Sequence, residues 1–150
     1  MQIAYKDTFI DVKSGTRVSE LFKDEINKSK NEIVACRFNN EIKGLNYKLK
    51  SSGTIELVDI TEKDGMRVYQ RGLIYVVGKA FHDIYPDALI TINYQLYHSM
   101  YCEIDNLNIT EEMIQKVNKR VKEIIDSNLP IERKTMSKEE AVSFYEREKL

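Results

Sequence analysis

Residues 65–86, GMRVYQRGLIYVVGKAFHDIYP, decide how the second half of this chain folds. Apolar side chains recur there at the three- and four-residue spacing that gathers them on one face of a helix. The recurring positions are Met66, Tyr69, Leu73, Val76, Val77, Ala80, Phe81 and Ile84. Pro86 ends the pattern, because proline cannot donate the hydrogen bond that would continue a helix. The spacing therefore predicts one long helix over residues 66–84.

The residues beyond this helix predict a small sheet and two further helices. Side chains alternate in polarity over residues 88–94, which indicates a half-buried strand, and residues 97–104 predict its hairpin partner. Thr110 is suited to cap a helix that runs to about Ser127, and Ser137 with Glu140 forms a capping box for a last helix. Residues 130–135 have the pattern of a strand. The prediction is a two-layer α/β domain with an antiparallel sheet and a long central helix.

The first 60 residues contain short elements in the order of a β-grasp fold. Strand patterns cover residues 2–6, 9–12, 33–38 and 54–58, and helical spacing covers residues 18–26. Asn39 and Asn40 predict a turn, since asparagine tolerates the left-handed conformation. The polar stretch 61–65 marks a boundary. We therefore predict an α+β chain with a β-grasp domain over residues 1–63 and the α/β domain over residues 64–150.

Composition narrows the classes of function. The chain has 150 residues, with 23 Lys and Arg against 24 Asp and Glu, and a formal charge of −1. This balance argues against a surface that is basic throughout, although a local basic face remains compatible with it. No apolar run reaches the roughly 18 residues of a membrane span, and no leader pattern opens the chain. We expect a cytoplasmic protein with no membrane partner.

The common motifs of catalysis are missing. The chain contains no phosphate-binding loop and no GxGxxG, GxSxG or HExxH pattern, so no catalytic residue is predicted. Cys36 and Cys102 belong to no CxxC pair. His82, His98 and Cys102 would form a metal site only if three distant segments converged. Ordinary packing and surface roles are the preferred alternative, and no metal is predicted.

Several strings resemble known domains. Residues 11–18, 35–41 and 54–57 resemble the TGS domain, a small β-grasp found at the N-terminus of threonyl-tRNA synthetases and in some GTPases. Residues 85–88, 101–104 and 129–133 resemble the second N-terminal domain of threonyl-tRNA synthetase, which in that enzyme proofreads mischarged tRNA. The resemblance covers essentially the whole chain in the same domain order.

One subgroup resembles the chain more closely. Residues 64–71 and 101–104 are similar to the N-terminal part of bacterial uridine kinase-like nucleoside kinases. The resemblance implies a non-catalytic accessory module, with its second domain truncated at the C-terminal end. ATP and magnesium would serve a P-loop kinase domain downstream. The alternatives are an N-terminal editing-region fragment of a threonyl-tRNA synthetase-like protein, or a stand-alone RNA- or ligand-binding module.

The resemblance also points to candidate site residues. The synthetase carries an HxxxH pair on its first helix, and this pair aligns with Arg71 and Tyr75, so hydrolysis by that mechanism is not expected. Arginine offers paired donors to phosphate, and a tyrosine ring stacks on bases. We therefore expect a cleft that takes nucleotide or structured RNA. Its candidate residues are Arg67, Arg71, Tyr75, Tyr94, His98 and Cys102. The alternative is that the arginines are solvated or ion-paired and Tyr75 packs in the core.

Overall fold

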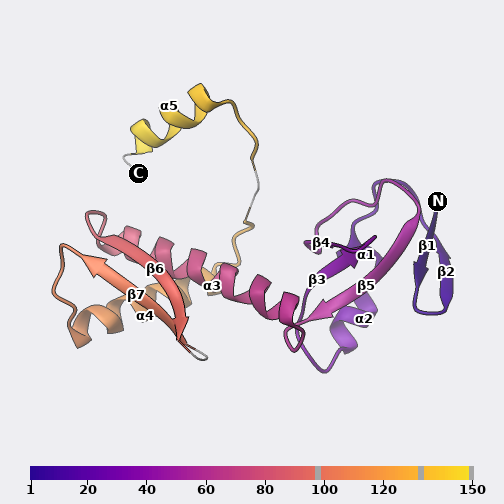
Figure 1. Cartoon of the computed structure of the whole chain (residues 1–150), viewed down its shortest axis with the longest axis horizontal. Helices are drawn as coiled ribbons and strands as arrows, with labels where there is room; N and C mark the ends of the chain where they lie inside the picture. The colour runs from indigo at the N-terminus through magenta and orange to yellow at the C-terminus, as the bar shows by residue number, and fades with distance from the viewer. Residues whose placement is uncertain (97–98, 132–133, 149–150) are drawn as a thin grey trace. The chain divides into compact units, whose positions relative to one another are not determined.

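The computed structural model describes residues 1–96, 99–131 and 134–148 (Figure 1). For residues 94–96 and 148 the description covers the backbone only. The chain divides into two compact units, Met1–Asn108 and Ile109–Leu150. The structure confirms the α+β class, with a mixed five-stranded sheet, a separate antiparallel hairpin and one long helix. The domain boundary expected after residue 63 stays a prediction.

The five-stranded sheet belongs to the β-grasp half of the first unit. Its strands are β1 (Gln2–Tyr5), β2 (Thr8–Asp11), β3 (Ile33–Phe38), β4 (Glu41–Lys43) and β5 (Gly53–Asp59), in the order β2-β1-β5-β3-β4. β1 pairs with β5 in parallel, and every other neighbouring pair is antiparallel. Asn39 and Asn40 have φ values of 47° and 66°, which confirms the predicted left-handed turn between β3 and β4.

One face of this sheet packs on two short helices instead of the single helix that the spacing predicted. The helices are α1 (Val18–Leu21) and α2 (Lys23–Lys28). Phe22 separates them with φ −110° and ψ 26°, and its side chain is fully buried. The buried core consists of Ile3, Val12, Val18, Phe22, Cys36, Phe38, Leu49 and Ile55. Burial of this apolar set is the main favourable contribution to the stability of the fold.

The long helix α3 (Lys63–Ile84) starts against the end of β5. A Cβ atom added to Gly65 would lie 1.8 Å from the backbone oxygen of Asp59, so only glycine allows this approach. Arg37 of β3 donates hydrogen bonds to Glu56 of β5 at 2.6 Å and to Glu62 and Asp64 at 3.3 Å each. These contacts join the first turn of α3 to two strands. α3 ends before Pro86, as predicted.

A two-stranded hairpin follows α3. β6 (Leu89–Leu96) pairs antiparallel with β7 (Ser99–Asp105), which confirms the predicted hairpin, and residues 97–98 lie outside the described part. The register shifts between Ile92 and Tyr94, so Asn93 is an extra residue in a bulge. Asn93 donates a hydrogen bond of 2.6 Å to Glu103 on the facing strand.

The second unit contains two helices, α4 (Glu111–Asp126) and α5 (Lys138–Glu148). Thr110 caps α4 by accepting a hydrogen bond from the backbone of Met113 at 3.3 Å, and Ser137 with Glu140 forms the predicted capping box. The strand predicted over residues 130–135 is wrong for residues 130–131 and 134–135, which form no strand, and residues 132–133 lie outside the described part. None of the helices in the described part of the chain is long and apolar enough to cross a membrane.

The start of α3 gives a direct test of the fold. We expect Gly65→Ala to lower the free energy of unfolding by about 2 kcal/mol or more, because the new methyl group would overlap backbone atoms at Asp59. Gly72→Ala is the matched control in the same helix, where no atom lies within 4 Å of the added Cβ. The free energy of unfolding of the control should rise by about 0.5–1 kcal/mol, because alanine is more favourable than glycine in a helix interior. Urea denaturation followed by circular dichroism measures both, and equal effects of the two substitutions would contradict this account.

Candidate functional site

A cavity of about 410 Å³ lies between α3 and the β6–β7 hairpin. The helix contributes six positions at three- and four-residue spacing, and the hairpin contributes one residue of β6 and three of β7. The lining residues are Met66, Tyr69, Gln70, Leu73, Ile74, Val77, Ile92, Ser99, Met100 and Cys102. Part of the apolar face whose spacing predicted α3 therefore borders a partly open cavity. Met66 and Leu73 on this face are each about 40% exposed.

Few polar groups reach this cavity. They are the Gln70 amide, the hydroxyls of Tyr69 and Ser99, and the Cys102 thiol, which lies 4.0 Å from the backbone oxygen of Met100. Ile92 and Cys102 are direct partners across the hairpin, so both belong to the face turned toward α3. Such a lining suits a mainly apolar group that carries one or two hydrogen-bonding atoms.

The predicted arginines and tyrosine lie on another face of α3. Leu73 and Val77 line the cavity, and Arg71 and Tyr75 precede them by two positions each. Two positions correspond to a rotation of about 200° around the helix axis, so Arg71 and Tyr75 point away from the cavity. Both side chains are exposed, and Tyr75 is 61% exposed. The alternative that Tyr75 packs in the core is therefore wrong. Arg71 and Tyr75 stand one turn apart on a shared face.

The remaining candidates divide into three groups. Arg67 is exposed and lies 3.7 Å from Asp64 of the preceding turn, as an ion pair between Nη1 and Oδ1. Cys102 lines the cavity. His98 and the side chain of Tyr94 lie outside the described residues. The structure therefore brings Arg71 and Tyr75 together on α3 and places Cys102 in the cavity, and the role of each stays a prediction.

Some cavity residues carried no signal in the sequence analysis. Ser99 and Met100 belong to no motif, and they meet the residues of α3 only because the hairpin packs near this helix. The pairing of β6 with β7 was predictable, but the register shift at Asn93 was not. Among the described residues, no three His, Cys, Asp or Glu side chains gather as a metal site.

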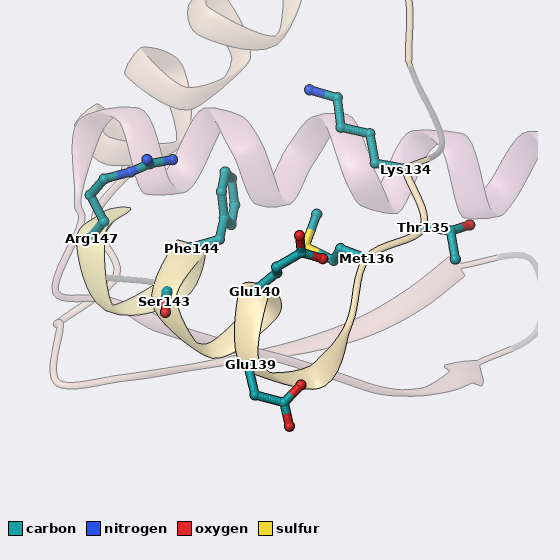
Figure 2. Close-up of a pocket in the computed structure, with 8 residues that line it drawn as sticks. All are labelled: Lys134, Thr135, Met136, Glu139, Glu140, Ser143, Phe144 and Arg147. Atoms are coloured by element: carbon teal, nitrogen blue, oxygen red, sulfur yellow. The ribbon is translucent and has the colours of Figure 1, made fainter.

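An open depression of about 690 Å³ beside α5 is a weaker candidate (Figure 2). Two of its charged groups, Glu140 and Arg147, already have structural partners. Glu140 accepts the backbone hydrogen bond of Ser137 at 2.8 Å, and the Arg147 guanidinium lies 5.6 Å from the centre of the Phe144 ring. Figure 2 shows Lys134 and Thr135 on the extended segment before the helix. We therefore take the α3 region as the candidate site.

Comparison with known proteins identifies the kind of protein that this chain is similar to. The chain matches no protein-family model. It is 29% identical to the threonine–tRNA ligase of Ligilactobacillus salivarius over 146 residues, or 95% of this chain and 22% of that protein. The threonine–tRNA ligase of Clostridium tetani is 26% identical over 144 residues (95% and 22%), and that of Ehrlichia chaffeensis over 132 residues (87% and 21%).

These relatives favour one of the two main functional predictions. The chain spans about a fifth of the length of the curated relatives it matches, and the similarity runs through nearly all of this chain. The chain is therefore similar to a region of threonyl-tRNA synthetases, which favours the synthetase-like alternative. Nothing supports the nucleoside kinase module that the sequence analysis preferred.

The two cysteines test the environments described here. Burial raises the pKa of the Cys36 thiol to about 11, whereas Cys102 is exposed at the cavity wall. Only the thiolate attacks a disulfide reagent, and Cys36 is fully buried. At pH 8, Ellman's reagent should therefore modify one thiol per native chain quickly, and two per chain in guanidinium chloride. Cys102→Ser should abolish the fast reaction, and fast labelling that survives this substitution would contradict the assignment.

Proposed function

We propose that this chain is a synthetase-like RNA-binding module that contacts RNA through the exposed face of α3. The similarity to threonine–tRNA ligases supports this choice, because tRNA is the nucleic acid in the name of those proteins. The chain covers about a fifth of such a protein, so the proposal assigns RNA contact to this chain and no ligase chemistry.

The observation that carries the proposal is the pair Arg71 and Tyr75. Both side chains are exposed on one face of α3, at the two positions where the resemblance implies the histidines of the editing domain. Arg71 has no ion pair with any described residue, whereas Arg67 is paired with Asp64. Arg71 is therefore the cation of this face that is available to a phosphate.

The chemistry of the pair suits a nucleic acid. A guanidinium group donates two parallel hydrogen bonds to a phosphate, and a tyrosine ring one turn away stacks on an unpaired base. Replacement of both histidines removes the groups that would move a proton. The polar side chains in the described lining of the cavity carry amide, hydroxyl and thiol groups, and none of these lining residues is a carboxylate or an imidazole. The proposal for Arg71 and Tyr75 is therefore one of RNA binding.

The test is the affinity of the full chain for a fluorescently labelled tRNA transcript at about 50 mM salt. We expect Arg71→Ala to raise Kd about 5- to 10-fold, because one charge-assisted phosphate contact is lost. Tyr75→Ala should raise Kd about 5-fold or more through the loss of stacking on a base. Fluorescence anisotropy measures both effects.

The matched control is Lys23→Ala in α2, which removes one exposed positive charge outside α3. Its Kd should change less than twofold. A mononucleotide that competes fully with the transcript at equal concentration would redirect the proposal from RNA to a nucleotide. Equal Kd values for wild type, Arg71→Ala and Tyr75→Ala would overturn the proposed site on α3.

A further inference from the structure

A second group of positive charges lies in the β-grasp half, on two segments that the sequence analysis did not connect. Backbone hydrogen bonds join residues 15–19 to residues 45–49. Gly15 donates to Leu49 at 2.7 Å, Leu49 donates to Thr16 at 2.9 Å, and Val18 donates to Tyr47 at 3.1 Å. The two segments therefore run antiparallel as a short ribbon.

The register of this ribbon sets two cations side by side. Arg17 and Lys48 are direct partners in an antiparallel bridge, in a pair that exchanges no hydrogen bonds with each other. Side chains in such a pair point to the same face and approach closely, with Cα atoms about 4.5 Å apart. Val18 and Leu49 are fully buried on the inner face, so Arg17 and Lys48 occupy the outer face.

Two further exposed lysines lie next to the ribbon in sequence. Lys50 is exposed two residues after Lys48, and buried Leu49 lies between them. Lys13 is exposed two residues before the ribbon, in a turn in which its backbone oxygen accepts a hydrogen bond of 2.9 Å from the Thr16 hydroxyl. We call Lys13, Arg17, Lys48 and Lys50 the basic ribbon.

The basic ribbon is not neutralised within the protein. Arg17 pairs with Glu20 at 3.5 Å, and both side chains are about half exposed, which makes this a weak pair. Lys13, Lys48 and Lys50 have no ion pair in the described part of the chain. Residues 44–55 contain no acidic side chain. Like charges placed directly opposite each other destabilise a strand pair, so this arrangement costs stability until an anion screens it.

We propose that the basic ribbon is a second RNA-binding surface, which holds phosphates of the nucleic-acid backbone independently of α3. The choice of RNA over other polyanions rests on the proposed function. The ribbon presents cations without an exposed aromatic ring. It therefore contacts phosphates and does not distinguish one base from another. It supplies affinity that depends on salt concentration, because each phosphate contact releases counterions.

The test compares Lys48→Ala/Lys50→Ala with Lys28→Ala/Lys30→Ala, a control pair of exposed lysines in the same half of the chain. For the labelled tRNA transcript, we expect the ribbon variant to raise Kd about 10-fold near 50 mM salt. The slope of log K against log salt should become shallower by about 1.4–1.8, since two phosphate contacts are lost. The control should change Kd less than twofold.

Two further measurements make the outcome decisive. The unfolding temperature of the ribbon variant should equal or exceed that of wild type, because the substitutions relieve repulsion, so weaker binding would not reflect misfolding. Unchanged Kd and salt slope in the ribbon variant would overturn the inference, even if Arg71→Ala weakens binding. Loss of affinity in the ribbon variant alone would support the ribbon and count against the site on α3. If polyglutamate displaces the transcript at an equal concentration of negative charge, the ribbon would instead be assigned to an acidic protein partner.

Discussion

The contact between the Arg37 guanidinium and three carboxylates joins the start of the long helix to the sheet. Glu56 lies on β5, whereas Glu62 and Asp64 belong to the start of α3, so one side chain of β3 joins the sheet to the helix. The partners are 40–60% exposed, and exposed ion pairs contribute little to stability. Their main effect is therefore on direction. Together with the close approach of Gly65 to Asp59, they fix the first turn of α3 and thereby the orientation of every later turn.

Because the first turn of α3 is held in place, two faces of this helix lie in different surroundings. A helix turns through a full circle every 3.6 residues, so the anchored first turn sets the angular position of all residues that follow. The apolar stripe that includes Leu73 borders the cavity beside the hairpin, while Arg71 and Tyr75 face elsewhere. A cation and an aromatic ring remain accessible because they lie on the face of the helix that is turned away from the cavity.

Local patterns in the sequence were sufficient to predict most of the fold. The periodicity of residues 66–84, Pro86, the capping residues Thr110 and Ser137, and the asparagine turn each depend on near neighbours in the chain. The interrupted helix at Phe22 was missed because burial of that ring outweighs helical spacing. The predicted strand near Ile131 failed in its described residues because a strand needs a partner, and this side chain is 66% exposed.

The candidate sites were less predictable, because they depend on contacts between distant segments. The i, i+4 relation of Arg71 and Tyr75 could be read from spacing alone. The cavity required knowledge of how the hairpin packs, and the pairing of Arg17 with Lys48 joins residues 31 positions apart. A net charge of −1 concealed the local concentration of positive charge. The net charge therefore limits how basic the whole surface can be, but it does not exclude a local group of positive charges.

The order of the strands has a consequence for how the chain is made. β5 is the last strand of the β-grasp sheet in sequence, yet it lies at the centre, between β1 and β3. When only the first 50 residues have emerged from the ribosome, two separate hairpins, β1–β2 and β3–β4, are available, and no strand yet connects them. The sheet closes only when β5 emerges and inserts between them. Because α3 starts four residues after β5 ends, completion of the sheet and positioning of the helix are consecutive steps of synthesis.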